Sequence, residues 1–239
     1  MDFSYLYSTR PRKNVDEDMA DIVATFRDLL KVKKTAVKLV NYYQGLPLCY
    51  PATIVGVDHG MLDLDIHPQQ AVAIERGHYT FIKCDGFPHM IGAHVQYINV
   101  HKRAVTLMKF FFAEIMAEHR HAIRLMLTPP TNAAFEAPKG PVKGQLYDLS
   151  VNGAGILVDH PCEMPEGTEL KLQLMVPNIV QNTHVIATTS ASFVGTSERD
   201  GAYLVRLAIS PDKAVEQHIS QYLFQRQVEI IRDLKEASV

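Results

Sequence analysis

Two arginines four residues apart, Arg120 and Arg124, are of a type and spacing that suit the binding of an anion. Each guanidinium presents a planar fork of hydrogen-bond donors, so the pair can hold two phosphate oxygens, or one phosphate and one base edge. The same spacing also suits an exposed helical face on which the arginines pair with Glu114 and Glu118. From these residues alone, an anion site and a solvated helix face are both open.

A second polar motif, in the sequence YDLSVNGAG, contains Asp148, Ser150, Asn152 and Gly153. Asp148 and Ser150 are two residues apart, so they lie on one face of an extended backbone. Asn152 and Gly153 favour a turn, and Gly153 lets a ligand approach the main chain closely. The alternative is a hairpin turn in which the Asp148 and Ser150 side chains bond the local backbone.

The elements that must position these residues are short strands, preceded and followed by a helix. Helical spacing of apolar residues predicts helices over 16–34 and 212–235. The second helix carries the stripe Val215, Ile219, Leu223, Val228, Ile231 and Leu234. Alternating patterns between turn residues predict strands at 35–43, 52–57, 61–66, 79–84, 90–99 and 104–110, and again at 124–127, 144–148, 153–158, 169–176, 183–194 and 202–209.

This pattern predicts a mainly β fold of two small antiparallel β-barrels in tandem, because closing a barrel removes exposed strand edges. Residues 1–15 have no sustained period, so we expect a flexible arm there. The first barrel and its helix would occupy 16–113. A linker at 114–124 would carry both arginines, and the second domain would lie within 118–239.

The composition disfavours several classes of protein. The chain has 24 Lys and Arg against 26 Asp and Glu, a net charge of -2, so the overall field disfavours DNA and any anion site must be local. The three cysteines lie far apart, which is typical of a reducing cytoplasm. We expect no transmembrane segment, because no stretch reaches about 18 uncharged apolar residues.

The sequence also predicts a protein that is not an enzyme and that needs no cofactor or metal. Its 11 histidines form no HExxH pattern, and Ser150 is not in a GxSxG context. His119 and His121 beside Glu118 could bind a metal, but adjacent exposed histidines usually do not.

Together, Arg120-x-x-x-Arg124 and Asp148-x-Ser150-x-x-Gly153 resemble the paired motifs of the PilZ domain family, the bacterial receptors for the second messenger cyclic di-GMP. The resemblance covers about half of the chain, residues 118–235, and continues through GILVDHPCEMPEGTELKLQLMVP and the last helix. It implies that Arg120 and Arg124 hold the phosphates and guanine edges, and that Asp148 accepts hydrogen bonds from a guanine N1 and N2 edge. Ser150 would then bond the ligand or hold the loop, and Gly153 would leave room for the ligand.

Three positions qualify this resemblance. His119 stands where many relatives have a further arginine, which implies that a second, stacked ligand is held less well, or only at lower pH. Asn152 lies within the second motif and is a further candidate for a ligand contact. Arg206 is in a late strand where many relatives have glycine, and it could add a ligand contact or face solvent. Strand alternation places it opposite Val205 and Leu207, which favours solvent.

The first half of the chain resembles, more weakly, the N-terminal PilZN barrel of flagellar-brake-type proteins. The matching features are the leading helix, the strand TAVKLVNYYQG and the strand VTLMKFFF. This resemblance implies a ligand that orders the linker arginines and thereby rotates one barrel against the other. The effector would be a partner protein in the flagellar apparatus or an exopolysaccharide system, with motility or biofilm as the controlled process.

Two alternatives stay open. One is a degenerate PilZ adaptor that binds protein but no nucleotide, against which the intact motif residues argue. The other is a flavin-binding barrel enzyme, although the chain has no Gly-rich loop of the kind that holds phosphates.

Overall fold

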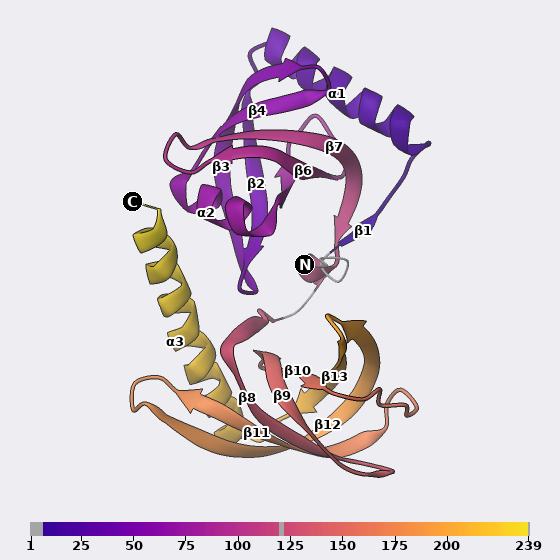
Figure 1. Cartoon of the computed structure of the whole chain (residues 1–239), viewed down its shortest axis with the longest axis vertical. Helices are drawn as coiled ribbons and strands as arrows, with labels where there is room; N and C mark the ends of the chain where they lie inside the picture. The colour runs from indigo at the N-terminus through magenta and orange to yellow at the C-terminus, as the bar shows by residue number, and fades with distance from the viewer. Residues whose placement is uncertain (1–6, 120–121, 239) are drawn as a thin grey trace. The chain divides into compact units, whose positions relative to one another are not determined.

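The computed structural model describes residues 7–119 and 122–238 (Figure 1). The described part forms two compact units. Unit 1 consists of residues 7–43, 47–119 and 231–238, and unit 2 of residues 44–46 and 122–230. Each unit is built on an antiparallel sheet, and the chain has a helix near each end, so the predicted fold class is confirmed.

Helix α1, Val15–Lys31, begins where its sequence provides a capping side chain. Asn14 accepts a hydrogen bond from the Glu17 amide, which satisfies one of the amides left free at a helix start. Ile22 and Phe26 are fully buried in the core of unit 1. Burial of such side chains contributes on the order of 2 kcal/mol each, and this apolar face fixes α1 to the sheet.

The sheet of unit 1 closes into a ring. Its strands follow the order β1-β7-β4-β3-β2-β5-β6, and a further pairing joins β6 back to β7. The core inside the ring comes from alternate positions of these strands, such as Leu39, Leu62, Leu64 and Leu107. The strands are β1 (Tyr7–Thr9), β2 (Ala36–Tyr43), β3 (Leu46–Asp58), β4 (Met61–Ile66), β5 (Tyr79–Lys83), β6 (Met90–Asn99) and β7 (Ala104–Ile115).

Two features of unit 1 differ from the sequence-based expectation. Residues Tyr7–Thr9, expected to be part of a flexible arm, form β1 and pair with Ala113–Ile115 on β7. The Tyr7 ring packs against Phe81 and Phe111, with centroids 5.3 and 5.4 Å away, and this apolar contact explains why the segment is ordered.

Helix α2, Pro68–Gly77, is the second difference, because no helix was predicted there. Proline at the first helical turn and His67 as the capping residue start it. Gln70, which is fully buried, donates a hydrogen bond to Asn41 Oδ1, and Asn41 Nδ2 donates to the Tyr79 carbonyl 2.7 Å away. These buried bonds link α2 to the sheet.

Unit 2 is a closed six-stranded barrel in the order β10-β13-β12-β11-β8-β9. Alternate residues point inward, and Ile156, Leu172, Leu174 and Val205 are completely buried. The barrel strands are β8 (Leu125–Ala137), β9 (Gly140–Ser150), β10 (Gly153–Val158), β11 (Glu169–Asn178), β12 (Thr183–Arg199) and β13 (Ala202–Ser210).

Strand β8 is longer than predicted and continues through Pro129 and Pro130, which we expected to end it. Proline has no amide hydrogen to donate to a neighbouring strand. The register with β9 jumps from Met126–Asp148 to Thr131–Leu146, so the two prolines lie where the ladder is interrupted. The strand therefore tolerates them.

Helix α3, Lys213–Ala237, follows the barrel, but its apolar face is not the predicted stripe. Ile219, Leu223 and Leu234 are buried as expected. Val228 and Ile231 are exposed, and Tyr222 and Ile230 are buried instead.

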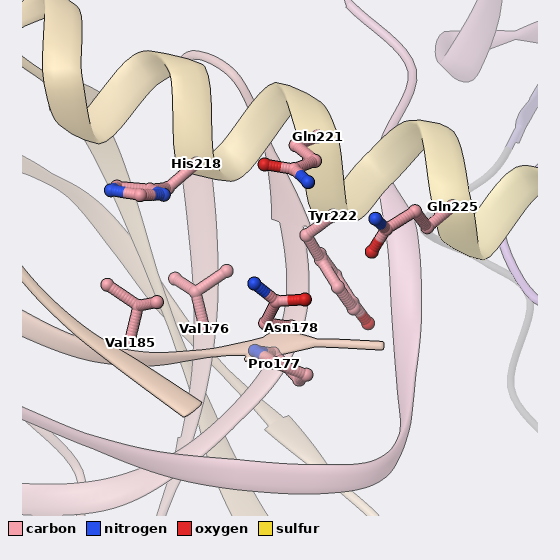
Figure 2. Close-up of a pocket in the computed structure, with 8 residues that line it drawn as sticks. All are labelled: Val176, Pro177, Asn178, Val185, His218, Gln221, Tyr222 and Gln225. Atoms are coloured by element: carbon pink, nitrogen blue, oxygen red, sulfur yellow. The ribbon is translucent and has the colours of Figure 1, made fainter. Parts of the chain in front are cut away.

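A small pocket lies between α3 and the ends of β11 and β12 (Figure 2). Tyr222 and Gln225 extend into it from α3, toward Pro177 and Asn178. Burial raises the pKa of Tyr222 to about 12, an effect that Arg226 partly opposes. The free volume is about 10 Å³, which is enough for about one water molecule. The pocket therefore has no room for an organic ligand.

No helix in the described part of the chain combines the length and apolarity that crossing a membrane requires.

Candidate functional site

The second polar motif forms the β9–β10 hairpin of unit 2. Ser150, the last residue of β9, lies opposite Gly153, and Asp148 lies opposite Gly155. Ala154 points into the barrel and is completely buried, so its neighbours Gly153 and Gly155 face outward. Residues directly opposite each other share a face. Asp148 and Ser150 therefore lie on one face, as their spacing predicted, and that face is the outer one of the barrel.

A bulge at Tyr147 is what turns Asp148 outward. Ile156 pairs with Leu146, but the next residue of β10, Gly155, pairs with Asp148 rather than Tyr147. The extra residue on β9 changes the face of the strand, so Leu146 is completely buried in the core while Asp148 is not part of it. Without this bulge, Leu146 and Asp148 would point to the same side.

Arg124 immediately precedes β8, and the pairing of Met126 with Asp148 brings it beside the motif. Its Nε lies 3.5 Å from Asp148 Oδ1, which makes an ion pair between side chains that are 24% and 11% exposed. Among the described residues, Arg124 Nε is buried and has no hydrogen-bond partner. The guanidinium is thus attracted to the carboxylate but is not held by a well-aligned hydrogen bond.

Two glycines provide the space in which this ion pair lies. A Cβ on Gly155 would be 2.7 Å from Asp148 Oδ2, and a Cβ on Gly153 would be 2.8 Å from Arg124 Nη2. Both distances are too short for a real contact, so the two charged side chains lie directly over glycine backbone. The sequence analysis identified Gly153 but missed Gly155. The signal was the sequence Gly-Ala-Gly, which places two glycines on one face of a strand.

Ser150 holds the end of the hairpin. Its hydroxyl lies 3.0 Å from Asn152 Oδ1 and 3.2 Å from the Gly153 carbonyl oxygen, and it is 1% exposed. This hydroxyl therefore bonds the local turn, which was the alternative interpretation of the motif. Asn152 itself is exposed.

The backbone behind Arg124 packs against residues Gln44–Leu46, which also belong to unit 2. The Met126 amide donates to the Gln44 carbonyl at 3.0 Å, and Arg226 Nη2 donates to Gln44 Oε1 at 2.6 Å. A Cβ on Gly45 would overlap the carbonyl oxygen of Arg124. Gly45 has a φ of +88°, which glycine adopts readily. The position of the Arg124 main chain is therefore set partly by a glycine distant in sequence.

The structure brings together Arg124, Asp148, Ser150 and Gly153 of the predicted site. Arg120 lies outside the described residues. His119 ends the short 3₁₀ helix η1, Met116–His119, and its side chain is not among those described. Within the described residues, no group of three or more His, Cys, Asp or Glu side chains could hold a metal ion.

This geometry allows one kind of recognition in particular. A carboxylate accepts two hydrogen bonds from adjacent N–H groups, and a neighbouring guanidinium donates to an anion. Both groups are largely withdrawn from water, where hydrogen bonds and charge interactions are stronger. A ligand with an N–H edge and a nearby phosphate would satisfy both.

The chain is similar to several solved structures at low sequence identity. The Bacillus subtilis inhibitor of motility MotI/DgrA is 13% identical, with a TM-score of 0.43, and the match covers 82% of this chain and 96% of that one. Escherichia coli YcgR in complex with c-di-GMP is 16% identical, with a TM-score of 0.42 and coverage of 99% of both chains. The K. pneumonia MrkH–c-di-GMP complex is 12% identical, with a TM-score of 0.45 and coverage of 95% and 99%.

No match is found among curated proteins. The family model described as the PilZ domain matches residues 118–225. That range contains the β9–β10 hairpin, Arg124 and the six strands of the unit 2 barrel. Residues 118–225 of this chain are a PilZ domain.

Proposed function

We propose that this protein is a receptor for cyclic di-GMP and has no catalytic role. The observation that carries the proposal is the Arg124–Asp148 ion pair, which lies over Gly153 and Gly155 within a PilZ domain. The resemblance of its motifs to those of cyclic di-GMP receptors supports this choice of ligand.

The ligand's chemistry fits the two charged groups. Cyclic di-GMP has two phosphates and two guanine bases, and each guanine has adjacent N1–H and N2–H donors. Asp148 accepts from these donors through both carboxylate oxygens, and Arg124 turns from Asp148 toward a phosphate or a base edge. Arg120 supplies a second guanidinium. Ser150 keeps the hairpin in shape, and His119 and Asn152 are secondary candidates for contact.

Ligand binding at the linker is also our proposal for how the signal is transmitted. We assign residues 16–113 to a PilZN-type domain, 114–124 to a linker and 118–239 to the PilZ domain with its C-terminal helix. A ligand that orders Arg120 and Arg124 against the barrel fixes the direction in which the linker leaves it. The resulting change in the relation of the two domains would act on a partner protein that controls motility, biofilm or exopolysaccharide.

Titration calorimetry of the full chain with cyclic di-GMP tests the ligand assignment. We expect a dissociation constant at or below the micromolar range, which corresponds to a binding free energy on the order of -8 to -9 kcal/mol. Arg124→Ala should weaken binding at least about tenfold, because it removes a charge-assisted contact. The same titration counts ligand molecules per chain. Absence of heat from folded wild-type protein, with no binding by a second method, would refute the assignment.

Small-angle X-ray scattering tests the proposed rearrangement. Saturating cyclic di-GMP should change the scattering curve of the wild type, and Arg124→Ala should need about ten times more ligand to show the same change. The control separates a ligand-induced change from an effect of added nucleotide. A wild-type protein that binds the ligand but scatters identically with and without it would contradict the rearrangement and leave the ligand assignment intact.

A further inference from the structure

We infer that Arg206 is an additional ligand-binding residue, which contacts a phosphate of the dinucleotide held by Asp148 and Arg124. The inference rests on the proposed function and extends the site from the β9–β10 hairpin to strand β13.

The strand register places Arg206 in line with the site. Asp148 on β9 pairs with Gly155 on β10, and Gly155 pairs on its other side with Arg206 on β13. Arg206 in turn pairs with Gly195 on β12. Because residues paired across a sheet share a face, this row of four lies on the outer surface of the barrel. Arg206 is exposed, as the sequence predicted, but the face to which it points is that of the candidate site.

The surface between Arg206 and Asp148 is made of small residues. Gly155 lies directly between the two, and in the adjacent row Gly153 lies between Ser150 and Ala208. Neighbouring strands are about 4.8 Å apart, so the Cα atoms of Asp148 and Arg206 are separated by roughly 10 Å. No side chain larger than a methyl group projects from these intervening positions. A ligand that spans two strands can therefore contact both charged residues.

Among the described residues, no carboxylate forms an ion pair with the Arg206 guanidinium. Its Nη2 instead lies over Gly195, 3.2 Å from where a Cβ on that residue would be. Glycine at this position gives the side chain room to lie against the sheet. Asp148, by contrast, already faces Arg124 at 3.5 Å. The positive charge of Arg206 is thus available to an anion, and a guanidinium fork matches two phosphate oxygens.

The test is a calorimetric titration of the full chain with cyclic di-GMP at two salt concentrations. Arg206→Gln should weaken binding about tenfold at low salt and by a smaller factor at high salt, because a charge-assisted contact is lost. Arg206→Lys keeps the charge without the fork and should lie between Gln and wild type. Lys171→Gln is the matched control, since it removes one positive charge from an exposed position on β11, which is not adjacent to β10 or β13.

The outcomes separate this inference from the function on which it rests. Wild-type affinity in Arg206→Gln would overturn the inference and leave the cyclic di-GMP receptor standing. Equal weakening in Arg206→Gln and Lys171→Gln would also overturn it, because the effect would then be one of net charge. A folded wild type that binds no cyclic di-GMP would overturn both. Weakening in Arg206→Gln alone, with circular dichroism unchanged, supports the contact.

Discussion

Asp148→Asn is expected to weaken cyclic di-GMP binding about 100-fold while leaving the barrel folded. A guanine N1 and N2 edge presents two donors, and a carboxylate offers two acceptors. Asparagine keeps the shape but offers one acceptor and one donor, so one donor of the ligand would face a donor of the protein. The loss of a charge-assisted bond and the unpaired buried group together cost on the order of 3 kcal/mol. Calorimetry gives the affinity, and thermal unfolding gives the stability.

The control for this substitution is Asp159→Asn, which removes a negative charge at an exposed position just after β10. This control should change the affinity little. Any change should strengthen binding, because removing a negative charge reduces the repulsion of an anionic ligand. If Asp148→Asn binds cyclic di-GMP as tightly as the wild type, Asp148 does not hold the guanine edge. If Asp148→Asn loses both binding and the folded state, the affinity of Asp148→Glu decides instead. Glutamate keeps both acceptor oxygens but displaces them.

Gly45→Ala is expected to lower both the stability of unit 2 and the affinity for cyclic di-GMP. An alanine at a φ of +88° is strained, and its Cβ would overlap the Arg124 carbonyl oxygen. Either this carbonyl or Gln44 must then move. We expect a cost of roughly 2 to 4 kcal/mol in the free energy of unfolding, measured with denaturant. Because the displaced carbonyl belongs to a proposed ligand residue, binding should weaken about tenfold.

Gly60→Ala is a close control for that change. Gly60 has a similar φ of +77°, but nothing lies within 4 Å of the position of its Cβ. It should therefore show the backbone strain alone, about 1 kcal/mol, with unchanged affinity. Equal effects of the two substitutions on stability and on binding would show that the contact between Gly45 and Arg124 has no influence on the site.

The sequence predicted the bounds of β4, β6 and β10 as the structure has them, because turn residues mark the ends of these strands. It did not predict α2, because ten residues are too few to show a clear helical period and Pro68 reads equally as a turn residue. It ended β8 at Leu127, before Pro129, because a proline usually stops a ladder. Whether it does so depends on the register of the neighbouring strand, which no local pattern contains.

The composition of the site could also be predicted, but its arrangement could not. Spacing alone placed Asp148 and Ser150 on one face. The bulge at Tyr147, which decides that this is the outer face, depends on pairing with β10. Alternation along β13 showed that Arg206 faces solvent. Only the register of three strands shows that it shares its surface with Asp148.

Residues Gln44–Leu46 have a consequence for any attempt to treat the PilZ domain as a separable module. They belong to unit 2, although more than 70 residues of unit 1 separate them in sequence from the rest of it. A domain excised at residue 118 would keep the whole family match but would lose the acceptor for the Met126 amide and one of the hydrogen-bond partners of Arg226. A transplant of this domain into another protein would therefore have to carry a substitute for residues Gln44–Leu46, because unit 2 is not one continuous length of chain.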